Sequence, residues 1–519
     1  MAKGKTPTQV QFEDAARLLG DRLAEGSIYR LLADEGLRMF DDEYFADCFT
    51  NSRRGRPTIP ARTIATVMLL QSFEGLSDAE ACDHLAFDLR WQAAAGLAAA
   101  CGSFHPTVLV GMRNRLRASA RPRRLLQDTV AIAQRAGVVS RKVRVLDSTP
   151  LLDAVATQDT VTQLRSGIRG VLRTAPADLA HRVRSALGRD DDYASAGKPP
   201  CDWDDPAARE DLVDALVRDA NAALEAIQGT ELAPDARAAA ELLAVVAGQD
   251  VQQREDGRFA IVRGVARDRV ISTVDAQARH GHKSRNRRFD GYKTHIAIDP
   301  DSEIITAVAT TPANTQDRDV IDDLIAEEPD QTDTEQPLIV GDSAYADGAT
   351  LARMAQAGRK IMTKVPVVRN AKGFSKDLFV IDTEAGAVRC PAGRVATIHS
   401  TRGGARASFV PHCANCPLAT ACTSARRGRV VSIHPHEDAL QAAKRRQRDP
   451  AWQQTYRETR PIVERKIAHF ARRPWGGRKA RCRGLKRIAT DADTRAGVLN
   501  LARLAALGLR WSPLGWATG

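Results

Sequence analysis

Apolar residues recur at the spacing of a helix face over residues 10–138. The pattern predicts four helices, in the segments VQFEDAARLLGDRLA, ARTIATVMLLQSFEG, SDAEACDHLAFD and LLQDTVAIAQRAG. Ser77 is a good start for the third, because its hydroxyl can cap free backbone amides and Asp78 and Glu80 add negative charge to the first turn. Arginines gather between these helices in two clusters: Arg53, Arg54, Arg56 and Arg62; Arg113, Arg115, Arg117, Arg121, Arg123 and Arg124. We expect a helical domain over residues 1–138 with basic connections, which would bind DNA ends; a solvated helical cap is the alternative.

A different pattern, rich in β-branched residues, predicts strands. VRVLD (143–147) reads as a short strand, and DRVISTVD (268–275) as a second. The segments GYKTHIAID and SEIITAVATT flank the turn Asp299-Pro300-Asp301-Ser302 and predict a β-hairpin. Beyond it the pattern alternates: a helix at 318–328, a buried strand at 336–345, a helix at DGATLARMAQAG and a strand at RKIMTKVPV. This order indicates an α/β fold around a mixed sheet.

The sheet is interrupted after its first strand. Residues 153–250 return to helical spacing, broken by an acidic, proline-containing stretch at 188–211 that reads as a loop. We therefore divide the chain into a helical domain, a split α/β core, a helical insertion, a Cys-rich insertion, and a C-terminal helix with a basic tail. Their predicted bounds are 1–138, then 139–152 with 268–366, then 153–267, 367–450 and 451–519.

Composition narrows the class of protein. The chain has 519 residues, 43% of them apolar and 27% charged, which suits a soluble protein of about three folding units. No apolar run approaches the roughly 18 residues of a membrane span, and the N-terminus carries no apolar signal segment, so we expect a cytoplasmic protein with no membrane partner. The net charge of +12 favours a polyanionic partner, of which nucleic acid is the commonest.

Two of the predicted strands are each followed by an aspartate. VRVLDST closes on Asp147 and LIVGDSAY closes on Asp342. Side chains at the carboxyl ends of strands leave the sheet into a crevice where ligands bind, and two carboxylates there are good ligands for Mg²⁺. Taken alone, each aspartate could equally cap the turn that follows it.

A third carboxylate lies in a basic segment. Residues 460–490 hold eleven Lys or Arg and one acidic residue, Glu464, in a predicted helix four residues after Arg460. An ordinary surface pair with Arg460 would account for Glu464. A catalytic role would instead explain why one carboxylate persists in a stretch suited to phosphates. We expect Arg460, Lys466, Arg472 and Arg473 of this tail to contact DNA.

A basic stretch with one aromatic residue precedes the predicted hairpin. Tyr292 and Lys293 follow Arg279, Lys283, Arg285, Arg287 and Arg288. Lys and Arg neutralise phosphates and Tyr can stack on a base, so Lys293 and Tyr292 are candidate DNA contacts. A solvated loop before a strand is the alternative.

Four of the nine cysteines are grouped. Cys390, Cys413, Cys416 and Cys422 have the count of a tetrahedral zinc site. A redox pair at Cys413 and Cys416, or four free thiols in a small insertion, would give the same spacing. The chain has no G-x4-GK[ST] phosphate loop and no HExxH motif, which excludes an ATPase or a zinc protease of those types.

Taken in order, these motifs resemble one family, the DDE transposases of bacterial insertion sequences. The resemblance spans roughly residues 50–510 and rests on RPTIPARTIATVMLLQSFEGLSDAEACDHLAFDLRWQAAAGL, VLDST, STVDAQARHGHKSRNRRFDGYKTHIAID, TTPANTQD, LIVGDSAY, RPIVERKIAHF, GGRKARCRGLKR and GVLNLARLAAL. The chain departs from the family in two places. Tyr456 stands four residues before Arg460 rather than three, and Ala471 occupies a position where relatives often have Lys.

The resemblance implies an RNase H-like catalytic fold with Asp147, Asp342 and Glu464 as its triad, holding two Mg²⁺ ions. The first metal-assisted cut would free a 3′-OH, which then attacks target DNA. The implied partners are the terminal inverted repeats of the element, target DNA, and further copies of the chain on DNA. Two alternatives stay open at this point: an RNase H-like nuclease that cuts without joining, and a DNA-binding protein whose catalytic residues have decayed.

Overall fold

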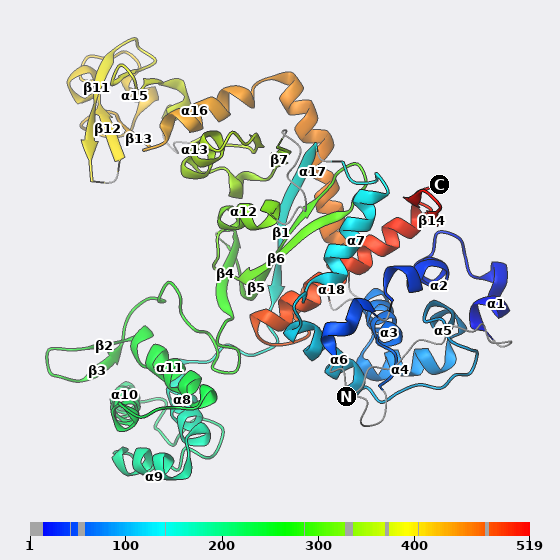
Figure 1. Cartoon of the computed structure of the whole chain (residues 1–519). Helices are drawn as coiled ribbons and strands as arrows, with labels where there is room; N and C mark the ends of the chain where they lie inside the picture. The colour runs from blue at the N-terminus through cyan, green and yellow to red at the C-terminus, as the bar shows by residue number, and fades with distance from the viewer. Residues whose placement is uncertain are drawn as a thin grey trace.

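The computed structural model describes residues 14–41, 43–49, 58–140, 142–284, 286–326, 336–368, 373–402, 404–472 and 477–519. Four bodies are visible in Figure 1: a set of N-terminal helices, a central mixed sheet with helices, a helical lobe and a small antiparallel sheet. Over the described residues, no helix has the length and apolar character needed to cross a membrane.

Helices form at all four predicted segments, and three further helices form between them, so that Arg113, Arg115 and Arg117 lie on a helix rather than in a connection. The helices are α1 (Ala15–Leu19), α2 (Ile28–Met39), α3 (Ala61–Glu74), α4 (Asp78–Phe87), α5 (Leu89–Ala94), α6 (Thr107–Ala118) and α7 (Arg124–Arg135), with short 3-10 turns η1 (Gly20–Arg22) and η2 (Glu43–Cys48). The predicted cap of α4 is present, since Ser77 and Glu80 each accept a hydrogen bond from the other's backbone amide. Arg53, Arg54 and Arg56 lie outside the described residues.

The central sheet has six strands: β1 (Val143–Leu152), β4 (Arg279–Ser284), β5 (Arg287–Ile298), β6 (Ile305–Pro312), β7 (Leu338–Val340) and β8 (Ile361–Met362). Their order is β4-β5-β1-β7-β8, with β6 also paired to β5. β5 runs antiparallel to β1, β4 and β6, whereas β1, β7 and β8 run parallel. The predicted hairpin is therefore confirmed as β5 and β6.

Helices cover both faces of this sheet. One face packs against α7, α17 (Pro450–Phe470) and α18 (Leu485–Ala506), through a core that includes Val145, Val340 and Val463. The opposite face packs against α12 (Ile321–Ala326), α13 (Gly348–Gln356) and α16 (Glu437–Arg446), through residues such as Leu146 and Tyr345. Neighbouring residues Val145 and Leu146 thus face opposite layers, as the two-residue period of a strand requires.

Three predicted elements differ from the structure. β1 continues to Leu152, so Asp147 lies inside it rather than at its end. Residues 268–275 form no strand: the backbone of Val270 bonds instead to the side chains of Gln163 and Gln249. The helix predicted at 318–328 is a 3-10 turn, η3 (Asp317–Val320), followed by α12; residues 327 and 328 are outside the described part.

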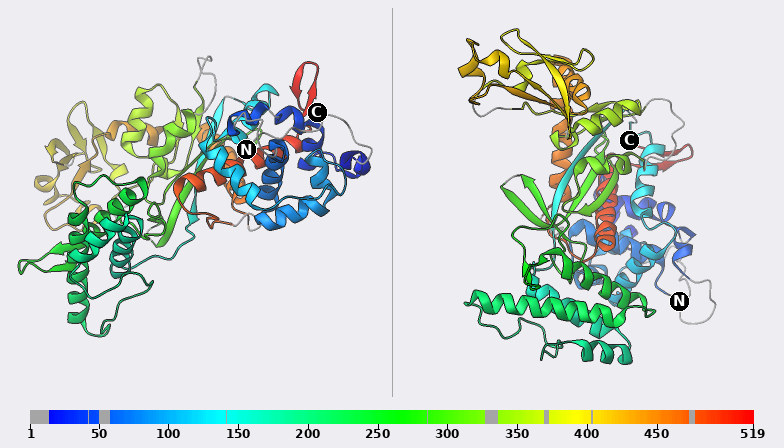
Figure 2. Two further views of the ribbon diagram at one scale, coloured as in Figure 1. Left: turned by 60° about the horizontal axis from the view of Figure 1, so that its bottom comes forward. Right: turned by 90° about the vertical axis from the view of Figure 1, so that its left-hand side faces the viewer.

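The helical lobe interrupts the sheet between β1 and β4. It consists of α8 (Thr160–Thr174), α9 (Ala177–Ala186), α10 (Pro206–Ile227), α11 (Pro234–Gln249) and the hairpin β2 (Val251–Gln253) with β3 (Phe259–Ile261). Its apolar side chains form a core of their own around Leu164, Leu216 and Leu243. Figure 2 shows the lobe and the N-terminal helices at different places around the central sheet.

The small sheet follows β8. It has the order β13-β12-β11-β10-β9, formed by β9 (Val380–Asp382), β10 (Ala387–Arg389), β11 (Val395–Thr401), β12 (Gly404–Ser408) and β13 (Val430–Ile433). The short helices α14 (Val410–Cys413) and α15 (Ala419–Cys422) lie between its last two strands, and α16 leads back to α17. The chain closes with the hairpin β14 (Arg510–Ser512) and β15 (Gly515–Ala517); the remaining 3-10 turns are η4 (Ser343–Tyr345) and η5 (Lys376–Leu378).

Candidate functional site

Asp147 lies on β1, and Asp342 lies two residues after the end of the neighbouring parallel strand β7. In the β1–β7 ladder, Val143 pairs with Leu338 and Val145 with Val340. Each aspartate follows its valine by two residues. Since side chains two apart on a strand share a face, Asp147 continues the face of Val145, which packs toward α17. β1 and β7 are therefore neighbours in the sheet, although β1 continues beyond Asp147 and pairs that residue with Ile296 of β5.

Helix α17 brings Arg460 and Glu464 over the same face. The helix begins after the cap residue Asp449 and buries Val463 and Ile467 against the sheet. Arg460 Nη2 lies 2.9 Å from Asp147 Oδ2 and 3.9 Å from Glu464 Oε1. One guanidinium therefore stands between two of the three candidate carboxylates. Glu464 itself remains open, with 63% of its side chain exposed.

Helix α17 also contacts the chain next to Asp342, the remaining candidate carboxylate. Tyr456 donates a hydrogen bond from its hydroxyl to the carbonyl of Gly341, at 3.1 Å. Gly341 immediately precedes Asp342, whose side chain accepts from the amide of Ala344 at 2.8 Å. The tyrosine that departs from the family spacing by one residue thus still ties the helix to the strand end of Asp342.

Burial and the neighbouring positive charge have opposite effects on the pKa of Asp147. Burial raises the pKa of its carboxyl above the ordinary value, Arg460 and the Ser148 amide offset part of that rise, and Asp342 adds to it. For Arg460, burial lowers the pKa, but Asp147, Asp342 and Glu464 together raise it above its ordinary value. The three carboxylates and the arginine are therefore one electrostatic cluster.

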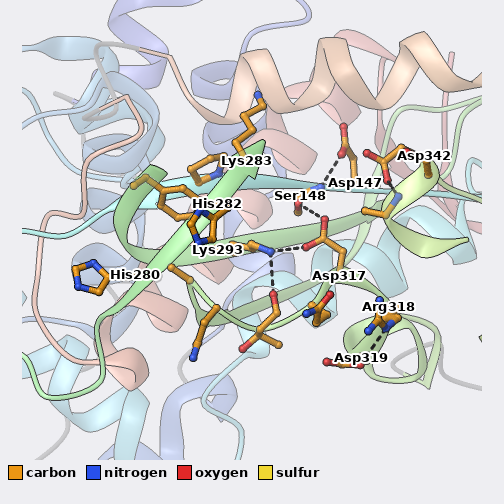
Figure 3. Close-up of a pocket in the computed structure, with 18 of the residues that line it drawn as sticks. Asp147, Ser148, His280, His282, Lys283, Lys293, Asp317, Arg318, Asp319 and Asp342 are labelled. Carbon is orange, nitrogen blue, oxygen red and sulfur yellow. Dashed lines mark hydrogen bonds and ion pairs between the residues drawn. The ribbon is translucent and has the colours of Figure 1, made fainter. Parts of the chain in front are cut away.

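All three carboxylates line a single open pocket of about 1260 Å³. Figure 3 shows Asp147 and Asp342 in this pocket together with Ser148, Lys293 and Asp317. Asp317 accepts hydrogen bonds from Ser148 Oγ at 2.7 Å and from Lys293 Nζ at 2.9 Å. Asp317 is not among the site residues predicted from the sequence; it is the last residue of the segment TTPANTQD, which matters only for the family resemblance.

The donor set suits a hard cation, but the side chains are not drawn together around one. Carboxylate oxygens are the ligands that Mg²⁺ prefers. Within the part of the chain that the structure describes, no group of three or more His, Cys, Asp or Glu is close enough to hold a metal ion. Arg460 is the cation that neighbours both Asp147 and Glu464 in this structure.

Two predicted DNA contacts are wrong. Tyr292 is 0% exposed and donates its hydroxyl to Asp275, so no base can stack on its ring. Lys466 is 4% exposed and pairs with Glu303 at 3.3 Å, which leaves its ammonium turned away from solvent. Both side chains are therefore part of the protein interior and do not lie on a surface that could contact DNA.

The remaining predicted DNA contacts are distributed differently. Lys293 lines the pocket but is paired with Asp317, and Arg460 lines it while paired with Asp147. Arg472 is exposed just after α17. Arg473 lies outside the described residues.

The four grouped cysteines surround one small cavity. Cys390, Cys413, Cys416 and Cys422 line it together with Phe379 and Phe409. Burial raises the pKa of the Cys422 thiol, and the other three cysteines raise it further, which shows that the four are electrostatic neighbours. None of the nine cysteines forms a disulfide.

Comparison with known families gives two matches. A family described as "Transposase DDE domain" matches residues 256–501, a range that contains Asp317, Asp342 and Glu464. A family described as "Transposase domain (DUF772)" matches residues 20–115, which cover the N-terminal helices α2 to α5 and most of α6. Asp147 lies between the two ranges. Neither the curated proteins nor the solved structures contain a match to the chain.

Proposed function

We propose a catalytic site and a reaction course for this chain, which belongs to the DDE-type transposases of bacterial insertion sequences. It is a DNA transposase: it cuts DNA at the ends of a mobile element and joins them to new DNA. The proposal is that Asp147, Asp342 and Glu464 form the catalytic triad. One observation carries it: Asp147 lies on β1, Asp342 lies just beyond the end of the adjacent parallel strand β7, and Arg460 links Asp147 to Glu464 over the same pocket.

The fold we propose for the core is RNase H-like. An antiparallel half (β6, β5, β1) adjoins a parallel half (β1, β7, β8); α12 precedes β7, and α13 connects β7 to β8. The two aspartates sit where these halves meet. We propose residues 139–152 and 268–366 as this core, 153–267 as a helical insertion, 367–450 as a Cys-rich insertion and 451–519 as the region of the third carboxylate and basic tail.

The triad would hold two Mg²⁺ ions. When bound, they would activate the attacking water or 3′-OH and stabilise the charge on the leaving oxygen of an in-line displacement. Arg460 holds Asp147 in place by its 2.9 Å contact and favours the charged form of that carboxyl, against the burial that raises its pKa. Glu464, exposed on one turn of α17, is free to move toward Asp147.

Asp317 and Lys293 support the first carboxylate from the other side. Ser148, next to Asp147 in the chain, donates to Asp317, which also pairs with Lys293. This network fixes the backbone of β1 at the catalytic residue. We assign both residues a positioning role at the edge of the pocket.

The partners we propose are the inverted repeats at the element's ends, target DNA, and further copies of the chain assembled on that DNA. We propose that the N-terminal helices, within residues 1–138, bind those ends. A nuclease that cuts without joining is the alternative reaction, and both family matches favour the transposase.

We also propose a structural zinc ion between Cys390, Cys413, Cys416 and Cys422. The four thiols line the same cavity, and four is the number of ligands in tetrahedral coordination. The cavity borders the small apolar core that contains Phe379 and Phe409. The thiolates would hold α14 and α15 against the sheet, in a module too small to rely on its apolar core alone.

The test of the reaction uses purified protein, Mg²⁺ and a duplex carrying the inverted repeat that flanks the reading frame. We expect nicking at the repeat end, and then joining of the freed 3′ end to a second duplex. Cutting without joining under these conditions would favour the nuclease. Asp342→Ala should do neither while still binding the repeat; cleavage by that variant would overturn the assignment of Asp342.

A further inference from the structure

A second concave surface lies between the N-terminal helices and α18, away from the catalytic pocket. We call it the arginine groove. It has a volume of about 490 Å³ and is lined by Met68, Gln71, Ser72, Leu76, Ser77 and Asp78, by Val110, Arg113, Asn114 and Arg117 of α6, and by Arg481, Cys482, Arg487, Thr490, Asp491 and Thr494. Its walls are α3, the start of α4, α6 and the first turns of α18, which pack on one another.

The cations of this groove outnumber its anions. Asp78 is neutralised by Arg113, whose Nη2 lies 2.5 Å from Asp78 Oδ1. Asp491 is neutralised from outside the groove by Arg495, at 3.1 Å. Its other arginines are left with no carboxylate of the groove to pair with: Arg117, Arg481 and Arg487. The groove therefore carries more positive than negative charge, and these three arginines form no ion pair within it.

Arg117 and Arg487 are the arginines best placed for an outside ligand. Arg117 donates to the neutral amide oxygen of Asn114, and neither arginine forms an ion pair with a carboxylate among the described residues. Burial lowers the pKa of Arg117, and Arg487 lowers it further, because the two cations lie near each other. Like charges held together without a counter-charge are what an anion site requires before its ligand arrives.

A short basic segment joins the groove to the catalytic pocket. Arg478 lines the pocket, and Arg481, three residues later, lines the groove. The segment is held to the end of β1, because the amide of Leu152 donates to the Arg478 carbonyl at 2.6 Å and the amide of Ala480 donates to the Leu152 carbonyl at 2.7 Å. β1 is the strand that carries Asp147.

The same segment is held at its other end by the N-terminal helices. Arg481 Nη2 donates to the carbonyls of Gly75 and Leu76, at 2.9 and 3.0 Å, just beyond the C-terminus of α3. A cation is favourable there, since the helix end carries partial negative charge. The segment from Arg478 to Arg481 thus connects the pocket to the groove along the chain, and it is anchored both to β1 and to the N-terminal helices.

We propose that the arginine groove binds the phosphate backbone of the DNA that flanks the cleavage site, with Arg117 and Arg487 as its principal contacts. The inference rests on the proposed function. A polyanion that enters the catalytic pocket passes Arg478 and reaches the groove along the same segment. An acidic protein segment is the other occupant that this charge would suit, but nothing about it would require the route to Asp147.

The experiment measures binding of a labelled repeat-end duplex as a function of salt. Each phosphate contact contributes about 0.9 to the slope of log K against log[salt], so R117A/R487A should lower the slope by about 2. R117K/R487K keeps both charges and should keep most of the slope. The matched control is R173A/R237A, which removes two exposed arginines of the helical lobe that form no ion pair with a described residue.

The outcomes separate the inference from the function on which it rests. If the wild-type chain cleaves the duplex but R117A/R487A has the wild-type slope, the groove proposal is wrong and the catalytic one stands. If the wild-type chain neither binds nor cleaves the duplex, the proposed function fails. Loss of binding to polyglutamate with unchanged DNA binding would overturn the groove in favour of an acidic protein partner. Circular dichroism of each variant confirms that it is folded.

Discussion

Arg460 Nη2 and Asp147 Oδ2 form a 2.9 Å ion pair between α17 and the middle of β1, with only 9% and 14% of their side chains exposed. The pair does two things at once. It locks the helix that carries Glu464 onto the strand that carries Asp147, and it gives a buried carboxylate a counter-charge. The second guanidinium nitrogen, Nη1, is buried without a partner among the described residues, so the arginine can accept a further anionic contact from the pocket side.

Removing one member of this pair should be costly for folding. Arg460→Gln leaves Asp147 buried and unpaired, and we expect it to lower the free energy of unfolding by about 3–5 kcal/mol. Urea unfolding in buffer with a metal chelator measures this. The matched control is the double variant Asp147→Asn/Arg460→Gln, which removes both charges and should lose clearly less stability. An Arg460→Gln protein as stable as the wild type would show that the pair is not maintained in solution.

The triad should be separable from stability and DNA affinity. Asp147→Ala, Asp342→Ala and Glu464→Ala should each reduce cleavage of the repeat-end duplex by about 1000-fold, which corresponds to about 4 kcal/mol of transition-state stabilisation. Repeat binding, measured by gel shift without Mg²⁺, should stay within about threefold of wild type. Asp319→Ala, an exposed carboxylate at the rim of the same pocket, is the control and should retain cleavage. Near-normal cleavage by any one triad variant would remove that residue from the site.

The course of the chain was predictable where local pattern and tertiary environment agree. The apolar runs before Asp147 and Asp342 predicted both strands, because a buried strand needs such a run whatever its neighbours. The end of β1 was not predictable, since Ser-Thr-Pro after Asp147 reads as a turn. Pro150 is tolerated in the strand because β7 pairs only with Val143–Val145, which leaves that side of β1 without a ladder at Pro150.

The other site features could not be predicted, because they depend on contacts between residues that are far apart in the sequence. Tyr292 reads as a stacking residue in a basic stretch, yet Asp275 accepts its hydroxyl hydrogen bond inside the core. Asp317 has no local sequence feature that marks it as a neighbour of Ser148. Arg460 was expected to meet DNA, and its position four residues before Glu464 gave no sign of the ion pair to Asp147. Such roles depend on which strand a helix packs against. The spacing of residues along a single helix or strand does not predict that.

The cysteine cluster gives a prediction that metal analysis decides. Purified, reduced protein should contain about one zinc ion per chain, and Cys413→Ser/Cys416→Ser should lose it, because two remaining thiolates cannot complete a tetrahedral site. Cys101→Ser/Cys201→Ser removes two cysteines outside the cluster and should keep the metal. Folded wild-type protein without zinc would leave four free thiols packed around Phe379 and Phe409.

Asn500 should matter more for stability than any other neutral polar residue of α18, because its amide replaces a backbone partner. Asn500 is 1% exposed; its Oδ1 accepts from the Ile305 amide and its Nδ2 donates to the Ile305 carbonyl, both at 2.8 Å. These two hydrogen bonds pair the backbone amide and carbonyl of Ile305 in β6, at the point where the register between β5 and β6 shifts, between Ala297 and Ile298.

Asn500→Leu would leave both backbone groups of Ile305 buried and unpaired, and each such group costs about 1–3 kcal/mol, so we expect a loss of about 2–6 kcal/mol in the free energy of unfolding. Asn500→Asp keeps the acceptor but loses the donor, and places a buried carboxylate against a carbonyl oxygen; it too should be destabilised, and more so as pH rises and the group ionises. Asn221→Leu, at a half-buried asparagine of α10 whose side chain forms no hydrogen bond with a described residue, is the control and should be nearly neutral. Urea midpoints of the three variants measure the difference, and equal midpoints for Asn500→Leu and Asn221→Leu would show that β6 does not depend on the Asn500 amide.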